Sequence, residues 1–134
     1  MAYNKPLPTP KPWSEPFWKA TTDERLLIQT CADCETKIAY PKRYCPECSG
    51  TDFDWVEATG LGTVYTFSTV YDYPPSAFAD DTPYTPAIIE LKEGVRLMSI
   101  IDATPSEIKC GLSVEVGCDP VSDSVWLPIF HPKK

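Results

Sequence analysis

Four cysteines in two close pairs are the residues of this chain best suited to bind a metal. Cys31-x-x-Cys34 is followed, after ten residues, by Cys45-x-x-Cys48. Four thiolates are a preferred tetrahedral ligand set for Zn²⁺, with Zn–S distances of about 2.3 Å. They also close the coordination shell, whereas a catalytic zinc keeps one position open. The pattern therefore predicts a structural zinc site.

Other uses of these cysteines stay open on the sequence alone. A redox CxxC pair normally lies in a βαβ context, and the pattern here does not favour one. An iron–sulfur or rubredoxin-type iron site uses the same four thiolates as a zinc ribbon. The two remaining cysteines, Cys110 and Cys118, have no metal-like spacing, so we expect them to be small buried hydrophobic residues.

The segment between the two pairs must bring them together. Its ten residues favour a short hairpin, in which residues 37–40 lead away from the first pair and residues 41–44 return to the second. This spacing is shorter than the 15–20 residues typical of zinc ribbons, but it is long enough for a hairpin. Gly50 then lets the chain turn away.

A helix and a strand are expected before the ribbon. Ser14 is a favourable N-cap residue, and it precedes an acidic residue and a proline that suit a first turn. We therefore predict a helix over residues 15–22. Residues 25–30 (Arg-Leu-Leu-Ile-Gln-Thr) favour a strand that leads into the first cysteine pair.

Beyond Gly60 the sequence becomes typical of β-structure. Five runs that are rich in β-branched and aromatic residues, or that alternate in polarity, predict five strands. These runs cover residues 61–71, 86–92, 95–101, 112–117 and 125–130. Glu93-Gly94 favours a tight turn between the second run and the third. Five short strands after a separate ribbon indicate a small closed or partly closed barrel.

The overall composition excludes some classes of function. With 19 acidic and 12 basic residues among 134, the chain has a net charge of -7, which argues against nucleic-acid binding. No stretch approaches the roughly 20 apolar residues of a membrane span. The first 12 residues lack the apolar core of a signal peptide. We therefore expect a cytoplasmic protein without a membrane anchor, in which paired cysteines favour metal or redox chemistry over disulfides.

Catalytic residues are not evident in the sequence. The single histidine, His131, lies near the end beside a proline, and we expect it at the surface. The GxSxG, HExxH and GxxxxGK[ST] patterns do not occur. We therefore expect the chain by itself to be catalytically silent.

Two segments rich in proline and aromatic residues favour contact with a partner. Residues 1–13 are predicted to form an extended arm, and residues 71–86 a long loop. Aromatic residues are common anchors in protein interfaces. The alternatives are a disordered tail and a loop that packs on its own small core. The residues predicted to bind a partner are Trp13, Phe17, Trp18, Tyr73, Phe78 and Tyr84.

The order of these parts resembles a known family. The family comprises OB-fold proteins with an N-terminal rubredoxin-like zinc ribbon, which are associated with acyl-CoA enzymes and were long described as a domain of unknown function. The resemblance covers about residues 14–132. Its matching segments are residues 17–18, 27–29, 40–48, 60–68, 86–94 and 127–130.

The resemblance implies a mainly β fold. It consists of an N-terminal helix and rubredoxin-like zinc ribbon over residues 14–58, followed by a five-stranded OB-fold barrel over residues 59–134, with residues 1–13 as the arm. Residues 103–111 are too few for the helix that many OB folds carry between their third and fourth strands.

The resemblance also implies a function. Such a chain would be a non-catalytic accessory subunit in a hetero-oligomer with a thiolase-fold enzyme, supporting assembly and the binding of a coenzyme A thioester. The reaction would make or break a carbon–carbon bond. The alternative is an accessory subunit of a hotdog-fold acyl-CoA hydratase, and a single-stranded nucleic-acid-binding module is less favoured.

Overall fold

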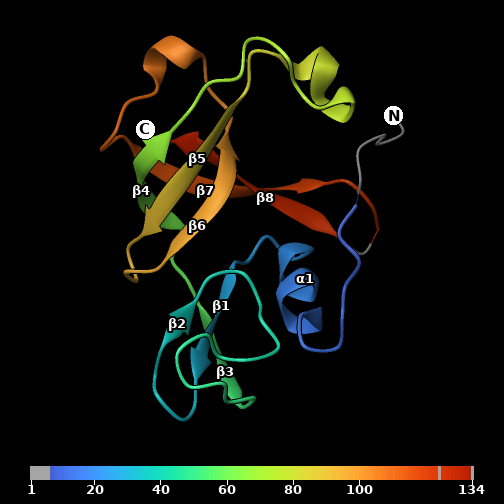
Figure 1. Cartoon of the computed structure of the whole chain (residues 1–134), viewed down its shortest axis with the longest axis vertical. Coiled ribbons are helices and arrows are strands. Elements are labelled where there is room, and N and C mark those ends of the chain that lie inside the picture. Colours follow the sequence, from blue (N-terminus) through green and yellow to red (C-terminus); the bar gives the residue numbers. More distant parts are fainter. Residues whose placement is uncertain (1–6, 124, 134) are drawn as a thin grey trace.

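The computed structural model describes residues 7–123 and 125–133, so residues 1–6 of the predicted arm lie outside the described part. The chain forms a three-stranded sheet and a five-stranded closed barrel. In Figure 1 the sheet and the helix lie below the barrel. The elements of the lower part are α1 (Glu15–Thr21), β1 (Leu27–Cys31), β2 (Lys37–Ile38) and β3 (Phe53–Glu57).

Helix α1 is one residue shorter than predicted, and Ser14 does not cap it with its side chain. Instead, the Ser14 hydroxyl closes the preceding turn, because Lys11 N donates to Ser14 Oγ (2.9 Å) and Ser14 Oγ donates to Lys11 O (3.2 Å). The helix buries Phe17 and Ala20 and contacts β1 and β8. Its start is therefore held by the end of the arm.

The lower sheet has the order β2-β1-β3, with antiparallel pairing throughout. Strand β3 (Phe53–Glu57) was not predicted, although it pairs with the whole of β1. The predicted hairpin is wrong in its second arm, because β2 pairs with β1 (Gln29 opposite Ile38) and residues 41–44 form no strand. Pro41 disfavours a returning strand because it has no N–H to donate.

The side chain of Gln29, which is buried, makes the hydrogen bonds to residue 42 that a neighbouring strand would otherwise make. Gln29, which is 1% exposed, accepts a hydrogen bond from Lys42 N (2.8 Å) and donates one to Lys42 O (3.1 Å). These bonds satisfy the backbone of the segment between the cysteine pairs. They also fix the position of Lys42.

The barrel confirms the five predicted strands, although their bounds differ by a few residues. Its order is β4-β5-β6-β8-β7, and pairing of β7 with β4 closes it. The pairs are antiparallel except for β6 with β8, which is parallel. The strands are β4 (Leu61–Phe67), β5 (Thr85–Leu91), β6 (Arg96–Ile101), β7 (Ser113–Pro120) and β8 (Trp126–Pro132).

The connections between barrel strands are short or contain 3₁₀ turns. The β4–β5 loop carries η1 (Ser76–Asp81), and the segment between β6 and β7 carries only the three-residue turn η2 (Pro105–Glu107). That segment therefore holds no α-helix among its described residues, in agreement with its length. No helix within the described ranges has the length and apolar character needed to cross a membrane.

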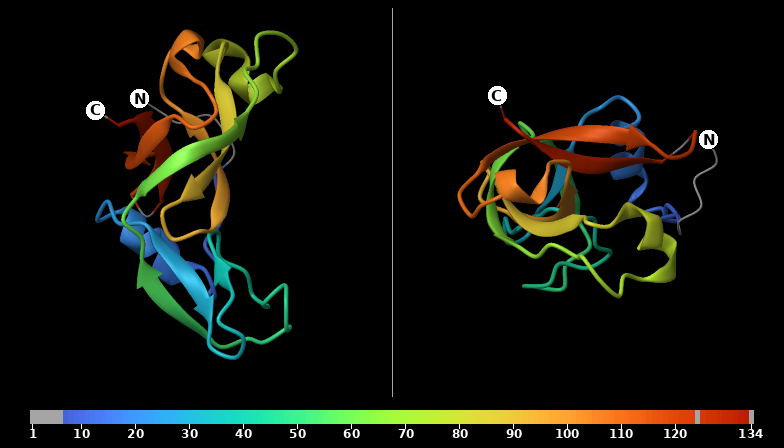
Figure 2. Two further views of the ribbon diagram at one scale, coloured as in Figure 1. Left: turned by 90° about the vertical axis from the view of Figure 1, so that its left-hand side faces the viewer. Right: turned by 90° about the horizontal axis from the view of Figure 1, so that it is seen from above.

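One apolar core joins the two parts of the molecule. It combines residues from the lower part with inward-facing residues of the barrel, since alternate residues of each strand point inside. Its fully buried members include Phe17, Ile28, Ile89, Val114 and Phe130. The side view in Figure 2 shows the lower sheet directly beneath the barrel.

Several hydrogen bonds join the two parts, among them a bond from Lys37 Nζ to Glu93 O (3.4 Å). Trp126 N donates to Thr21 Oγ1 (3.3 Å), Tyr40 Oη donates to Met98 O (2.6 Å), and Thr59 N donates to a Glu93 carboxylate oxygen (2.9 Å). These bonds link α1 to β8, the ribbon to β6, and the connecting segment to the β5–β6 turn. The ribbon is therefore fixed in orientation relative to the barrel.

Candidate metal centre

The two cysteine pairs form two knuckles with the same backbone geometry. In the first, Cys31 N donates to Thr36 O (2.8 Å), Glu35 N donates to Cys31 O (2.8 Å), and Glu35 has a φ of 65°. The second knuckle has the equivalent bonds, because Cys45 N donates to Gly50 O (2.9 Å) and Ser49 N donates to Cys45 O (2.9 Å). Ser49, at the position equivalent to Glu35, also has a φ of 65°. Each knuckle therefore presents two sulfurs on one side of a tight turn.

The four sulfurs converge on one point. Their Sγ atoms lie within 4.8 Å of one another, and the Cys31–Cys48 and Cys34–Cys45 Sγ pairs are each 3.5 Å apart. A tetrahedral site with Zn–S bonds of about 2.3 Å requires sulfurs about 3.8 Å apart. The four-cysteine cluster is therefore consistent with a zinc-ribbon metal site.

The thiols of this cluster cannot all ionise easily without a cation. A hydrogen bond with the Thr36 hydroxyl (3.1 Å) is the main cause that lowers the pKa of Cys34 to about 6. At Cys48 the Gly50 N–H lowers the pKa, but the neighbouring thiols of Cys31 and Cys34 outweigh it and raise the pKa to about 12. A dication at the centre favours the thiolate form of all four, because it compensates their mutual repulsion.

The backbone beside the cluster leaves little room. A Cβ on Gly50 would lie 2.6 Å from Asp33 Oδ2 and 3.3 Å from Cys48 Sγ. A larger residue at this position would therefore have to displace the Asp33 side chain and press on the Cys48 sulfur. Cys31 and Cys45 are buried, whereas Cys34 and Cys48 are exposed, so the cluster lies at the surface of the ribbon.

The two cysteines outside the cluster, which were both predicted to be buried, differ in exposure. Cys118 is buried in the barrel, and burial raises its pKa to about 11. Cys110 is exposed, which corrects the expectation of a buried residue, because it follows the η2 turn at the surface. His131 is partly exposed and lies 3.4 Å from the Asp102 carboxylate.

The aromatic residues of the N-terminal segment do not share one environment. Trp13 is 36% exposed, and the Arg43 guanidinium lies 5.5 Å from its ring centroid. Phe17 is 0% exposed and fills the chain's own core, so it has no surface to offer a partner and the prediction for it is corrected. Trp18 is partly buried and packs edge-to-face on Phe17, with the ring centroids 4.8 Å apart.

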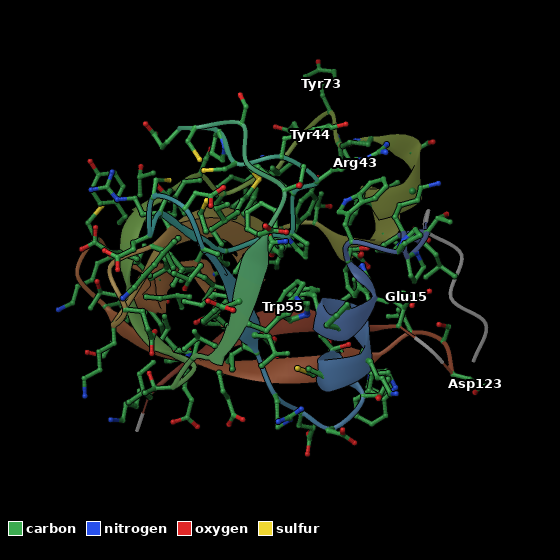
Figure 3. All side chains as sticks on the ribbon, turned by 90° about the horizontal axis from the view of Figure 1, so that it is seen from below. Glu15, Arg43, Tyr44, Trp55, Tyr73 and Asp123 are labelled. Atoms are coloured by element: carbon green, nitrogen blue, oxygen red, sulfur yellow. The ribbon has the colours of Figure 1, made fainter. Side chains whose placement is uncertain are left out.

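The loop aromatics also differ from one another. Tyr73 is fully exposed, whereas Phe78 stacks on Tyr84 with the ring centroids 5.3 Å apart. Val70 and Tyr84 form a β-bridge that closes the base of the loop. In Figure 3, Tyr44 and Tyr73 project toward the same side of the molecule.

Tyr40 and Gln29 position the segment between the cysteine pairs, and neither was predicted as a site residue. Burial raises the pKa of Tyr40 to about 12, and its hydroxyl bonds to the backbone of β6. Gln29 lies two residues before Cys31 on β1 and points to the same face. The available signal was a polar residue directly after the apolar run of residues 26–28, in a segment predicted to be a strand.

Two family models match the chain. The zinc ribbon model, described as "ChsH2, rubredoxin-like zinc ribbon domain", matches residues 18–54. The other, described as "ChsH2, C-terminal OB-fold domain", matches residues 55–119.

Two similar proteins are a hydratase subunit and a scaffold protein. The chain is 37% identical over 118 residues to a probable enoyl-CoA hydratase alpha subunit of Thermomonospora curvata, covering 87% of this chain but only 36% of that protein. It is 36% identical over 101 residues to a DUF35 domain-containing scaffold protein of Methanocaldococcus jannaschii, covering 73% of this chain and 71% of that protein.

A thiolase subunit and an aldolase complex are also similar. Identity to the benzoylsuccinyl-CoA thiolase subunit BbsA of Thauera aromatica is 30% over 95 residues, covering 70% of this chain and 63% of that protein. The solved structure of an Ltp2-ChsH2(DUF35) aldolase matches with a TM-score of 0.78 and 34% identity, covering 94% of this chain and 98% of that chain.

Proposed function

Because this chain belongs to the ChsH2 (DUF35) family of zinc-ribbon and OB-fold proteins, we propose that it is a non-catalytic accessory subunit of a thiolase-type acyl-CoA enzyme. The observation that carries this proposal is the match, over 94% of the chain, to the ChsH2(DUF35) aldolase structure. In the complex, this subunit supports assembly and the binding of an acyl-CoA thioester. The partner supplies the nucleophile and the acid–base groups for a reaction that makes or breaks a carbon–carbon bond.

Within this subunit, Cys31, Cys34, Cys45 and Cys48 hold one structural zinc ion. The convergence of the four sulfurs supports this assignment. The zinc supplies folding free energy and no open coordination position. Iron fits the same four thiolates, so elemental analysis of protein from its source must identify the metal.

The contact with the partner involves the arm and the β4–β5 loop. Exposure supports Trp13 and Tyr73 as contributors, and Trp18, Phe78 and Tyr84 present part of their rings. In this proposal, residues 1–13 act as an arm, residues 14–58 as the metal-binding part, and residues 59–134 as the OB part of a cytoplasmic hetero-oligomer.

A second candidate is an accessory role with an acyl-CoA hydratase. The similarity to a probable enoyl-CoA hydratase alpha subunit supports it. In that case the partner would have the hotdog fold, and the same ribbon and barrel would hold it. The reaction would add water to a double bond and leave the carbon chain intact.

Affinity purification separates these candidates. The tagged full chain is purified from its source cells, and the proteins that co-purify are identified by mass spectrometry. We expect a thiolase-fold subunit in constant ratio to the chain, whereas a hotdog-fold subunit would establish the second candidate. The purified chain alone should not cleave a 3-oxoacyl-CoA with coenzyme A, and turnover at the rate of the complex would refute an accessory role.

A further inference from the structure

Two of the three outward-facing cross-strand pairs of β5 and β6 are apolar, and the third is Glu90–Arg96. In an antiparallel sheet with one buried face, the residues that point outward are normally polar. Here the cross-strand pairs Ile88–Met98 and Pro86–Ile100 point outward, because the residues between them are buried in the barrel. Met98 is 60% exposed. An exposed apolar face of this kind indicates a binding surface.

Two shallow grooves meet on this face. One, of about 340 Å³, extends toward the ribbon and is bordered by Lys42 and Pro46. The other, of about 260 Å³, extends toward the β4–β5 loop and is bordered by Phe67. Both are lined by Ile88 and Met98, so they form one continuous surface, which we call the docking groove.

Projecting segments flank the docking groove at its two ends. In the side view of Figure 2, the ribbon segment between the cysteine pairs and the β4–β5 loop extend on the side where β5 and β6 lie. Exposed aromatic residues occupy both projections, since Tyr44 is 53% exposed and Tyr73 is 100% exposed. Aromatic residues around an apolar centre are typical of protein interfaces.

The charge at the ribbon end of the groove is opposite to that of the whole chain. Lys37, Lys42 and Arg96 line this end, and no aspartate or glutamate is among the residues that line either groove. Arg96 is partly neutralised by Glu90 (2.9 Å) and lies over the ring of Tyr65 (3.8 Å). The chain as a whole carries a net charge of -7, so the basic side chains at this end of the groove favour an acidic segment over a basic one.

We infer that the docking groove binds an extended, acidic segment of the thiolase-fold partner, with an apolar side chain over Met98 and carboxylates near Lys37 and Lys42. This inference rests on the proposed function. A protein segment fits better than a small ligand, because ligand pockets bury 70–90% of the ligand surface. This groove is open, and its central side chain is 60% exposed.

Photo-crosslinking tests the position of the partner. The tagged full chain carries a benzophenone amino acid in place of Met98, or in place of Val56 as the control, which is 43% exposed on β3. We expect position 98, and not position 56, to crosslink to the thiolase-fold subunit through a peptide rich in aspartate and glutamate. A crosslink from position 98 to nucleic acid or coenzyme A, or no crosslink there, would overturn the inference.

Charge reversal tests the chemistry of the segment. Lys42→Glu should weaken the affinity for the co-purified thiolase-fold subunit at least tenfold by calorimetry, whereas Lys109→Glu, an equal charge change on an exposed residue outside the grooves, should change it less than twofold. Equal effects of the two variants would count against the docking groove. If the subunit co-purifies but neither test identifies the groove, the accessory function stands and this inference fails; if no thiolase-fold subunit co-purifies, both fail.

Discussion

Replacing Cys31 with serine tests both the metal site and its contribution to the fold. Cys31 is 0% exposed, and its Sγ lies 3.5 Å from that of Cys48. The variant keeps three thiolates and places a hydroxyl, a poor zinc ligand, in the fourth position. Structural zinc contributes roughly 10–16 kcal/mol in zinc-finger peptides, against roughly 5–15 kcal/mol for the whole stability of a domain. We therefore expect loss of the metal to unfold the sheet of β1, β2 and β3.

Cys118→Ser is the matched control, because Cys118 is also buried (7% exposed) but lies in the barrel. It should cost roughly 1–3 kcal/mol for burying a hydroxyl and leave the metal content unchanged. Metal content is measured by elemental analysis, and hydrogen exchange compares the amides of β1 with those of β8. For Cys31→Ser we expect less than half of the normal zinc, fast exchange in β1 and a lower melting temperature than for Cys118→Ser. Full zinc content together with the same melting temperature would refute the reasoning.

Three further predictions concern the junction, the pH dependence and the arm. Tyr40→Phe removes the bond to Met98 O and should lower the free energy of unfolding by about 1 kcal/mol in chemical denaturation; an unchanged value would mean that the bond contributes nothing. Burial raises the pKa of Tyr40 to about 12 and that of Cys118 to about 11, so both groups release their protons more readily when unfolded. Stability should therefore fall as the pH rises from about 9 to 12, with a smaller fall in Tyr40→Phe, and a rise over this range would contradict the assignment. A chain that begins at Trp13 should stay folded and keep its metal but bind the partner more weakly by calorimetry, because it loses the arm; unchanged affinity would exclude the arm from the interface.

The parts that could be predicted from the sequence are those with local signals. The four cysteines are identified by spacing within each pair, and the barrel strands by alternation within each run. Strand β3 (Phe53–Glu57) was missed because it is only five residues long and gains its pairing from β1, more than twenty residues away. The false second arm of the hairpin has a similar cause, since Gln29 satisfies the backbone there from a distant strand.

Surface residues were harder to predict than core residues. Phe17 and Trp13 lie four residues apart and are both aromatic, yet one is fully buried and the other is 36% exposed. Aromatic content alone does not distinguish them, because Phe17 lies on α1, which packs against β1 and β8, whereas Trp13 lies in the turn before this helix. Met98 carries no motif and was not predicted as a site residue. Its place in the proposed docking groove follows from the register, which sets it beside Ile88 on the outside of the barrel.

The proposed metal centre and the proposed docking groove share one segment of the chain. The wall of the groove on the ribbon side includes Lys37, Lys42 and Pro46, and all three lie between Cys34 and Cys48 in the chain. A metal that holds both cysteine pairs therefore holds the two ends of this wall. Between those two ends, hydrogen bonds of Gln29 and Tyr40 hold the wall in position.

These two residues connect the metal site to the barrel. Gln29, on the same face of β1 as Cys31, holds the backbone of Lys42, and the Tyr40 hydroxyl bonds to the backbone of Met98 at the centre of the groove. Without the metal, the strand β1 and the wall lose their common anchor, while the closed barrel keeps its own hydrogen bonds. Chelation should therefore weaken partner binding before it unfolds the barrel. We expect this order because the docking groove, unlike the barrel, is built partly from the segment between the two cysteine pairs.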